Sequence, residues 1–228
     1  MIAGALGLVT AAFTVAVSAA PEPTAFADAR LIVEVNATDG DAGLQIFLDG
    51  EPWKQVEVRR PGGGRIIDFE TAGVLRGYGL TELFSESSEP PFTEFPLSEF
   101  KALFPEGVYT FSGTTLDGTP LTGRASLSHD LPNGPRIVAP EDGERLSDGQ
   151  VAVRWRRGPQ PSGVEIVGYQ VVITREDPLR VLAVDLPASV TSLMLPAGFI
   201  QQTEYALEVL AIEASGNQTL TEIHFTVR

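Results

Sequence analysis

Short runs in which apolar and polar residues alternate follow one another from Pro135 to the end of the chain. Such alternation places successive side chains on opposite faces of an extended strand. Prolines and Asp-Gly or Gly-Asn pairs end most of the runs, and these residues favour turns. Seven runs fall within residues 136–228, so the pattern predicts a small β-sandwich in this half of the chain.

Aromatic residues at particular places in these runs specify the sandwich further. Trp155 lies in the second run, VAVRWRR, and Tyr169 lies in the third, VEIVGYQVVITRED. The sixth run, TEYALEVLAIEASGN, contains Tyr205 near its start and follows the pair Leu195-Pro196. With these residues, the segment from Arg136 to Arg228 resembles the fibronectin type III family. The resemblance implies that the Tyr205 hydroxyl turns back to nearby backbone and fastens the crossing between the two sheets.

The same resemblance implies a modest function for residues 136–228. Domains of this family usually serve as spacers or as protein-binding modules. The Arg-Gly-Asp tripeptide that some members use for cell adhesion does not occur in this chain. The loop between the sixth and seventh runs is only ASGNQ, too short to form a large recognition surface. We therefore expect this domain to act as a spacer.

Residues 30–132 also alternate as strands do, but they resemble no family known to us. Hairpins are predicted around Asp49-Gly50, around Pro61 to Gly64 and around Asp117-Gly118. Six strands favour a second β-sandwich or a small barrel. The segment DLPNGPR, residues 130–136, contains two prolines and a glycine and is the predicted domain boundary. The predicted fold class is therefore all-β, with two tandem β-sandwich domains and a short helical insert in the first.

That insert, LTELFSESSEPPFTEFPLSEFKALFPEG, holds five of the chain's twelve phenylalanines among glutamates. Leu97, Phe100 and Leu103 have helical spacing, and Thr81 or Ser98 is a candidate cap for the helix. The rings either cover one open end of the domain core, which is the reading we favour, or form an acidic and aromatic surface for a partner. If the insert binds a partner, the predicted contact residues are Phe92, Glu94, Phe95 and Phe100.

The charge of the chain excludes two classes of partner. It carries 16 basic and 30 acidic side chains, a formal net charge of -14, and no long segment is basic. A nucleic-acid binder needs clustered Lys and Arg to neutralise phosphates, and an anionic membrane surface attracts the same residues. We therefore predict a protein or glycan partner and no nucleic acid.

The N-terminal residues indicate export. Residues 1–20 contain no charged side chain, and Ala27-Asp28-Ala29 offers a cleavage site of the small-x-small type. We predict a signal peptide over residues 1–29, cleaved near Ala29, and a bacterial periplasmic or secreted protein. The chain has no cysteine, so its domains are held by packing and not by disulfides. A signal peptide usually opens with Lys or Arg, and none occurs before Arg30. Either the true start lies upstream or the segment remains as a membrane anchor.

Motifs for catalysis and metal binding are missing from the sequence. It contains no cysteine, no Gly-x-Ser-x-Gly elbow, no His-Glu-x-x-His pair and no phosphate-binding glycine loop. His129 is expected to make a structural hydrogen bond, and His224 is expected to be solvated. Asp39-Gly40-Asp41 resembles the opening of a calcium loop, but glycines stand where the fifth and twelfth positions need ligands. An ordinary turn explains these aspartates better.

These observations predict a non-enzymatic binding or scaffold protein without catalytic residues, cofactor or metal. The N-terminal domain would engage a protein or glycan partner, and the second domain would hold it at a distance. One alternative is a secreted hydrolase that acts through carboxylates of the N-terminal domain. A cleft with two carboxylates about 5 to 10 Å apart would favour it. The other alternative is a calcium-dependent surface protein that uses Asp39 and Asp41.

Overall fold

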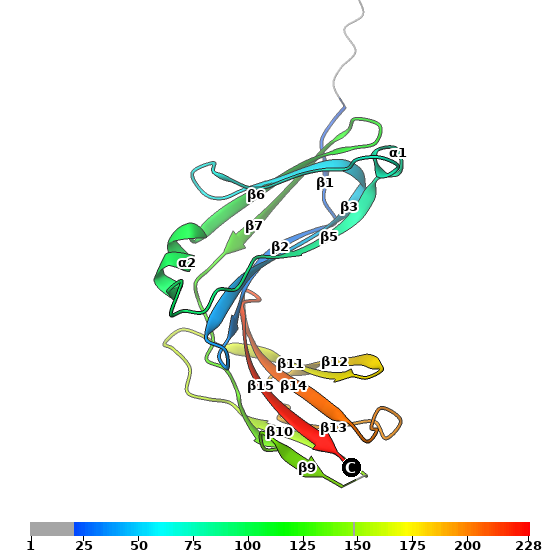
Figure 1. The fold of residues 1–228 in the computed structure, drawn as a ribbon. Helices are drawn as coiled ribbons and strands as arrows, with labels where there is room; N and C mark the ends of the chain where they lie inside the picture. Colours follow the sequence, from blue (N-terminus) through cyan, green and yellow to red (C-terminus); the bar gives the residue numbers. More distant parts are fainter. Residues whose placement is uncertain (1–20, 148) are drawn as a thin grey trace, which may run out of the picture.

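A computed structural model describes residues 21–147 and 149–228, which form two β-rich domains, each with its own hydrophobic core (Figure 1). The predicted signal peptide lies mostly outside the described residues. The elements of the N-terminal domain are β1 (Thr24–Ala25), β2 (Asp28–Asn36), β3 (Asp41–Arg59), β4 (Arg65–Glu70), α1 (Leu75–Tyr78), β5 (Leu80–Glu86), α2 (Leu97–Leu103), β6 (Gly107–Thr115) and β7 (Pro120–Leu127). Those of the C-terminal domain are β8 (Arg136–Ala139), β9 (Glu144–Leu146), β10 (Ala152–Arg156), β11 (Ile166–Glu176), β12 (Leu179–Pro187), β13 (Ser192–Met194), β14 (Glu204–Glu213) and β15 (Gln218–Val227).

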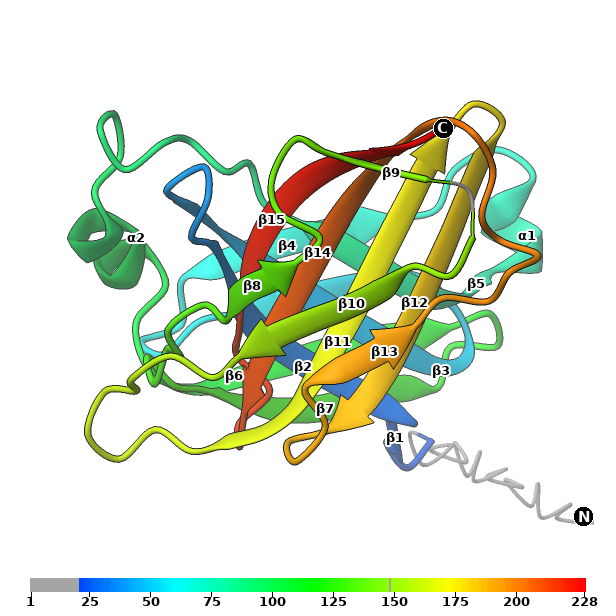
Figure 2. The same cartoon turned by 90° about the horizontal axis from the view of Figure 1, so that it is seen from below.

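The C-terminal domain is the sandwich that the alternating runs predicted. One sheet has the order β13-β10-β8, and it lies over the other, β12-β11-β14-β15 (Figure 2). The short strand β9, which we did not predict, pairs in parallel with β15. Inward-facing residues of both sheets form the core, among them Trp155, Tyr169, Tyr205 and Phe225. The predicted fibronectin type III-like fold is therefore confirmed.

Tyr205 makes the contacts that the resemblance implied. Its hydroxyl accepts a hydrogen bond from the backbone N–H of Gln201 at 2.6 Å and donates one to the Gln201 carbonyl at 3.0 Å. Its ring stacks on Phe225 with the centroids 5.0 Å apart. A buried tyrosine satisfied by local backbone in this way is a structural residue that fixes the entry to its strand.

The N-terminal domain is also an open sandwich, and its longest strand belongs to both sheets. The first half of β3 pairs with β2 and β5, and its second half pairs with β4 and β6. The pairing register shifts between Asp49 and Trp53, where the strand passes from one sheet to the other. One sheet is therefore β2-β3-β5, and the other continues from β4 through β3, β6 and β7 to β1.

The predicted hairpin at Asp49-Gly50 is wrong, because the chain continues as a strand through these residues. Gly50 serves a different purpose there. A Cβ built on it would stand 2.9 Å from the Phe26 ring, so only glycine allows this ring to reach the core. The hairpins around Pro61 to Gly64 and around Asp117-Gly118 are confirmed as the β3–β4 and β6–β7 connections.

The strand order of the N-terminal domain repeats that of the C-terminal domain. Each has a three-stranded sheet facing a four-stranded one, and a short strand pairs in parallel with the last strand of the domain. Tyr109 matches Tyr205, because its hydroxyl donates to the carbonyl of Pro105, also four residues earlier, at 3.0 Å. The consecutive strands β10 and β11 of the C-terminal domain, which lie in different sheets, correspond to the two halves of the single long strand β3. This difference hides the repeat in the sequence.

The folded N-terminal domain begins before the predicted start at Arg30. Phe26 is 7% exposed in the core, and β1 pairs in parallel with β7. Asp28, Ala29 and Arg30 lie side by side in β2, paired with β3. The predicted signal peptide of residues 1–29 therefore overlaps residues that belong to the sandwich. Among the described residues, no helix has both the length and the hydropathy to cross a membrane.

Candidate functional site

The two domains share one continuous sheet. Strand β2 of the first domain pairs in parallel with β15 of the second, with Glu34 opposite Gln218 and Asn36 opposite Leu220. The sheet therefore runs in the order β5-β3-β2-β15-β14-β11-β12 across the junction. Figure 1 shows β2 and β15 meeting where the domains join. Main-chain pairing of this kind fixes both register and orientation, so the second domain is not a freely hinged spacer.

Asn217 fastens the junction from the loop between β14 and β15. Its side-chain oxygen accepts from the backbone N–H of Val33 at 2.8 Å. Its amide nitrogen donates to the carbonyl of Ser128 at 3.0 Å and to that of Asp130 at 3.3 Å. The residue is 1% exposed. The short ASGNQ loop, which the sequence predicted to have little binding role, is thus the element that locks the two domains together.

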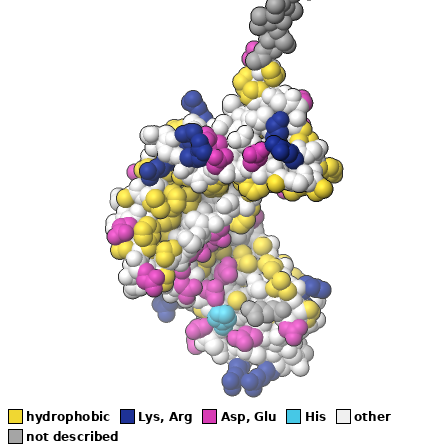
Figure 3. All heavy atoms as spheres, turned by 45° about the horizontal axis from the view of Figure 1, so that its top comes forward, with side chains coloured by type: hydrophobic (Ala, Val, Ile, Leu, Met, Phe, Trp, Pro, Cys, Tyr) yellow, Lys and Arg dark blue, Asp and Glu magenta, His cyan; other side chains and the backbone are white. Residues whose placement is uncertain are grey.

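A cleft of about 800 Å³ lies beside this junction and is lined by both domains. The space-filling view shows the molecule hollowed between its two domains (Figure 3). The first domain contributes the outward face of β2 and β3, Phe84 of β5 and part of β7. The second contributes Gln170 of β11, Asp185 of β12 and residues near the β14–β15 loop. A volume of this size is typical of sites for small or medium-sized ligands.

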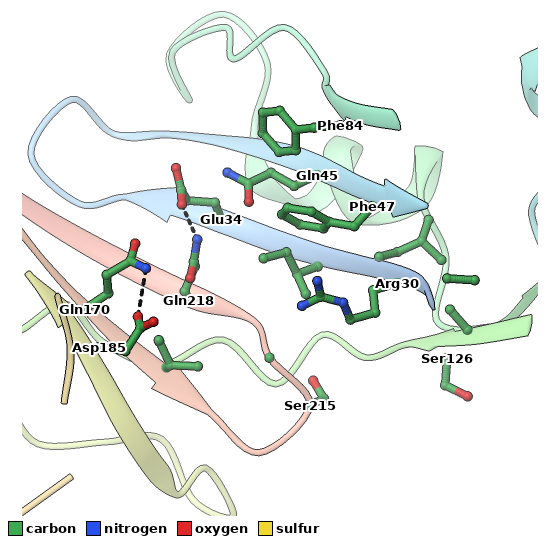
Figure 4. A pocket seen from close by; sticks show the side chains of 16 residues that line it. Arg30, Glu34, Gln45, Phe47, Phe84, Ser126, Gln170, Asp185, Ser215 and Gln218 are labelled. Carbon is green, nitrogen blue, oxygen red and sulfur yellow. Dashed lines mark hydrogen bonds between the residues drawn. The ribbon is translucent and has the colours of Figure 1, made fainter. Parts of the chain in front are cut away.

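Three side chains on adjacent strands form a ladder along one wall of the cleft. Arg30, Phe47 and Phe84 lie opposite one another on β2, β3 and β5. The two rings have centroids 5.0 Å apart, and the Arg30 guanidinium carbon lies 4.8 Å from the Phe47 centroid (Figure 4). Phe84 remains 58% exposed. Cross-strand aromatic and cation–π contacts hold such side chains in place, so the wall presents a preformed aromatic surface.

Paired amides and carboxylates line the rest of the cleft. Glu34 accepts a hydrogen bond from Gln218, and Asp185 accepts one from Gln170 at 2.8 Å (Figure 4). Gln45 donates to Glu86 at 2.8 Å and holds that carboxylate at the edge of the site. Each carboxylate is thus oriented by a glutamine on a neighbouring strand. Planar groups held in this way can exchange hydrogen bonds with a polar ligand at little cost in conformational entropy.

Carboxylates also cluster at the edge of the cleft. Glu34, Glu86 and Glu89 have oxygen atoms that all lie within 4.8 Å of one another. Partial burial, and then the charges of Glu86, Asp41 and Glu34, raise the pKa of Glu89 to about 7. Glu89 packs against the bare backbone of Gly43, where any Cβ would collide with it. Crowded like charges favour the protonated form, so this edge of the site is less anionic at neutral pH than its composition indicates.

The hydrolase alternative gains no support from this arrangement. Of the described residues that line the cleft, Glu34 and Asp185 are the carboxylates, and each is engaged by a glutamine. Glu86 and Glu89 crowd against Glu34 on one side of the site. Glycoside hydrolysis needs two carboxyl groups that flank the scissile bond. The cluster of Glu34, Glu86 and Glu89 at one edge does not provide that geometry.

The insert that the sequence singled out lies against the core of the N-terminal domain. Helix α2 forms as predicted, but Pro96 precedes it without a side-chain cap, and Thr81 belongs to β5. Phe100 is 3% exposed, and Phe92 and Phe95 pack partly buried against the same core. Glu94 is exposed. These positions favour the core-covering reading, while binding through the insert stays a prediction. Phe92 does line a second cavity of about 550 Å³, beside His129 and the linker between the domains.

The residues of the cleft were missed by the sequence analysis, although one signal was present. Phe47 and Phe84 interrupt the polar outward faces of β3 and β5, and an aromatic residue on the outward face of a strand is a candidate binding residue. The predicted structural role of His129 matches the structure, where its ring nitrogen lies 2.8 Å from the Phe104 carbonyl. Asp39 accepts from the Asn36 amide at 3.0 Å in the β2–β3 turn. Calcium binding at Asp39 and Asp41 stays an alternative hypothesis.

Comparisons with known proteins concern the fold alone. No protein-family model and no curated protein matches the chain. An engineered protein of known structure is 18% identical over 46% of this chain and 21% of its own length, with a TM-score of 0.33. A segment of two fibronectin type III domains from chicken tenascin is 11% identical over 88% of this chain and 98% of its own, with a TM-score of 0.32. A bacterial ice-binding adhesin, described in terms of retention at the host cell surface, is 14% identical over 90% of this chain and 65% of its own, with a TM-score of 0.31. The strand order and the Tyr205 contacts show that residues 136–228 form a fibronectin type III-like sandwich.

Proposed function

We propose that this chain is a non-enzymatic binding module whose recognition surface is the cleft between its two domains. The observation that carries the proposal is the junction itself. Pairing of β2 with β15 and the buried contacts of Asn217 hold two walls of one cleft at a fixed separation. A site formed in advance loses little entropy when its ligand binds.

The chemistry of the cleft suits binding better than catalysis. Its walls combine an aromatic surface with hydrogen-bonding groups whose orientation is fixed by neighbouring side chains. Such a mixture of apolar surface and few oriented polar groups is typical of ligand-binding pockets. The uncharged and mostly apolar residues 1–20 and the lack of cysteine support a place of action in the bacterial cell envelope or outside the cell. The partner belongs to the protein or glycan material found there.

A blocking substitution tests the proposal. Ser126 is an exposed residue of β7 that lines the cleft, so Ser126→Trp places a large side chain in the site. Ser112 is an exposed residue of β6 outside the cleft lining, and Ser112→Trp is the matched control. Both variants and the parent protein are immobilised and exposed to cell-envelope and extracellular material, and the bound protein and sugar are quantified.

We expect Ser126→Trp to lose at least nine-tenths of the specifically bound material, while Ser112→Trp retains it. Circular dichroism and thermal melts establish that both variants are folded. Equal retention by the two folded variants, or no specific retention by the parent, would show that the cleft is not the recognition surface.

A further inference from the structure

Resting on the proposed function, we propose that the ligand of the interdomain cleft is a sugar chain without negative charge. The inference rests on three features of the cleft: its aromatic wall, its oriented amides and carboxylates, and its local charge. Each feature is set by residues on different strands, and together they select one class of ligand.

The aromatic wall suits the apolar face of a sugar ring. Phe84 is 58% exposed, and its position is set by contact with Phe47, whose centroid lies 5.0 Å away. Arg30 extends the same surface, because its guanidinium lies over the Phe47 ring. A pyranose ring presents C–H groups on one face, and these pack on the electron-rich face of an aromatic ring. The ladder therefore gives a sugar ring a surface on which to stack.

The polar groups of the cleft suit sugar hydroxyls. Gln170 with Asp185, and Gln218 with Glu34, each join an amide to a carboxylate from the neighbouring strand. In each pair the amide group and the carboxylate have more hydrogen-bonding positions than their mutual contact uses. A hydroxyl group donates one hydrogen bond and also accepts hydrogen bonds, so two neighbouring hydroxyls can bridge such a pair. Figure 4 shows both pairs on the side of the cleft where β2, β11, β12 and β15 approach one another.

The charge of the cleft disfavours anionic polymers. Glu34 and Asp185 line it, Glu86 stands beside Glu34, and the whole chain carries a net charge of -14. Arg30 is the cation of the lining, and Asp28 already binds it at 2.6 Å. A sulfated, phosphorylated or uronic-acid polymer would meet repulsion without a compensating cluster of Lys and Arg. Uncharged sugars meet no such barrier.

The size of the cleft indicates a short stretch of chain and not a single sugar. Its volume is about 800 Å³, near the upper end of the usual range for ligand pockets. The hollow in Figure 3 is open to solvent, so the ends of a longer polymer can extend beyond it. Each ring that stacks or bonds along the groove adds to the affinity, and we expect binding to strengthen with chain length.

The test uses an array of immobilised oligosaccharides and polysaccharides, neutral and acidic, probed with the whole chain. Isothermal titration with a neutral hexasaccharide that binds on the array then gives the affinity. We expect neutral chains to bind and uronic-acid and sulfated chains to give no signal. Phe84→Ala should weaken the measured affinity at least tenfold, and Gln170→Ala should weaken it several-fold. Tyr78→Ala removes an aromatic ring that is 81% exposed on α1, outside the cleft lining, and should leave the affinity unchanged.

Three results would overturn the inference: no neutral sugar bound anywhere on the array, tighter binding of acidic chains, or equal affinity for the parent and a folded Phe84→Ala variant. A separate measurement distinguishes this failure from that of the proposed function. If material captured through the cleft resists periodate oxidation and is removed by protease, the cleft binds protein, and only the sugar assignment fails.

Discussion

The side-chain oxygen of Asn217 accepts a hydrogen bond at 2.8 Å from the backbone N–H of Val33, a residue 184 positions earlier in the chain. A residue in a turn of the second domain thereby provides the hydrogen-bond acceptor for a backbone N–H group of the first. Both residues are buried, so neither can exchange this contact for water. The orientation of the two domains, and with it the width of the cleft, depends on this contact and on the pairing of β2 with β15.

Asn217→Ala is expected to loosen the junction. It removes the partner of the Val33 N–H, and an unsatisfied buried polar group costs about 1–3 kcal/mol. For a chain of this size, that corresponds to a fall in Tm of about 2–12 °C. Small-angle scattering should show a broader distribution of overall dimensions for the variant than for the parent. Gln202→Ala, at an exposed position away from the junction, is the control, and equal scattering from both variants would contradict the proposed role of Asn217.

Phe26→Ala is expected to destabilise the N-terminal domain strongly. The ring is buried where Gly50, Gly113 and Gly123 leave room for it, and a Cβ on any of the three would approach it to 3.2 Å or less. Loss of a buried phenylalanine typically costs about 3–5 kcal/mol.

A chain that begins at Pro21 should melt like the full chain, and one that begins at Arg30 should melt at a lower temperature. N-terminal sequencing of the exported protein should place cleavage before Thr24, and a mature terminus at Arg30 would contradict this expectation.

The two tyrosine corners give a matched pair of tests. Tyr205→Phe removes the bonds to Gln201, and Tyr109→Phe removes the bond to Pro105. Each change keeps the ring and removes part-buried hydrogen bonding between the hydroxyl group and local backbone, so the free energy of unfolding should fall by about 0.5–1.5 kcal/mol. Chemical denaturation measures the loss. If both substitutions proved neutral, the hydroxyl groups would have no structural role.

The stability of the protein should depend on pH through Glu208. This residue lies opposite Glu222 on β14 and β15. Burial, and then the charges of Glu222 and Glu34, raise the pKa of Glu208 from 4.5 to about 7. The folded state therefore holds the Glu208 proton more tightly than the unfolded state does, and this contribution is fully present below pH 4.5. It is lost as the pH rises from about 4.5 to 7.

Glu208→Gln should accordingly raise the Tm at pH 8 and reduce its fall between pH 5 and pH 8. Partial solvent screening limits the expected gain to about 1–2 kcal/mol, or a few degrees in Tm. Glu204→Gln, at an exposed position on the same strand, is the control. Parallel pH profiles for the parent and Glu208→Gln would show that this carboxyl group does not titrate in the expected range.

The insert can be tested by separating its buried and exposed residues. Phe100→Ala should lower the free energy of unfolding by about 3–5 kcal/mol because the ring is in the core. Glu94→Ser should change it by less than about 0.5 kcal/mol because the side chain is exposed.

Capture of partner material by a variant with Phe92, Glu94 and Phe95 changed to Ser then distinguishes a partner-binding insert from one that only covers the core. A folded variant that loses the partner would show that the insert binds it, and unchanged capture would leave these rings as cover for the core.

The sequence predicted those parts of the fold that depend on neighbouring residues. Alternation around Tyr205 predicts a strand because successive side chains point to opposite faces, and a local bond from its hydroxyl needs only the residue four positions earlier. Tyr109 makes the same kind of local bond to Pro105. The sequence analysis did not identify it, because the single long strand β3 hides the repeat of the fold. The Asp49-Gly50 pair was predicted to form a turn because Asp-Gly favours turns, although the role of Gly50 is to leave room for the ring of Phe26, which lies between β1 and β2.

The candidate site depended on contacts that no local pattern encodes. By itself, the sequence determined an all-β chain with a fibronectin type III-like second domain, an acidic surface and no catalytic motif. The tertiary structure decided that Phe26 belongs to the core, that β2 and β15 join the domains, and that Phe84 and Gln170 line one cleft. The reason is physical: strand formation follows the periodicity of adjacent residues, whereas the cleft exists only because two distant strand edges pair and a buried amide holds them in register.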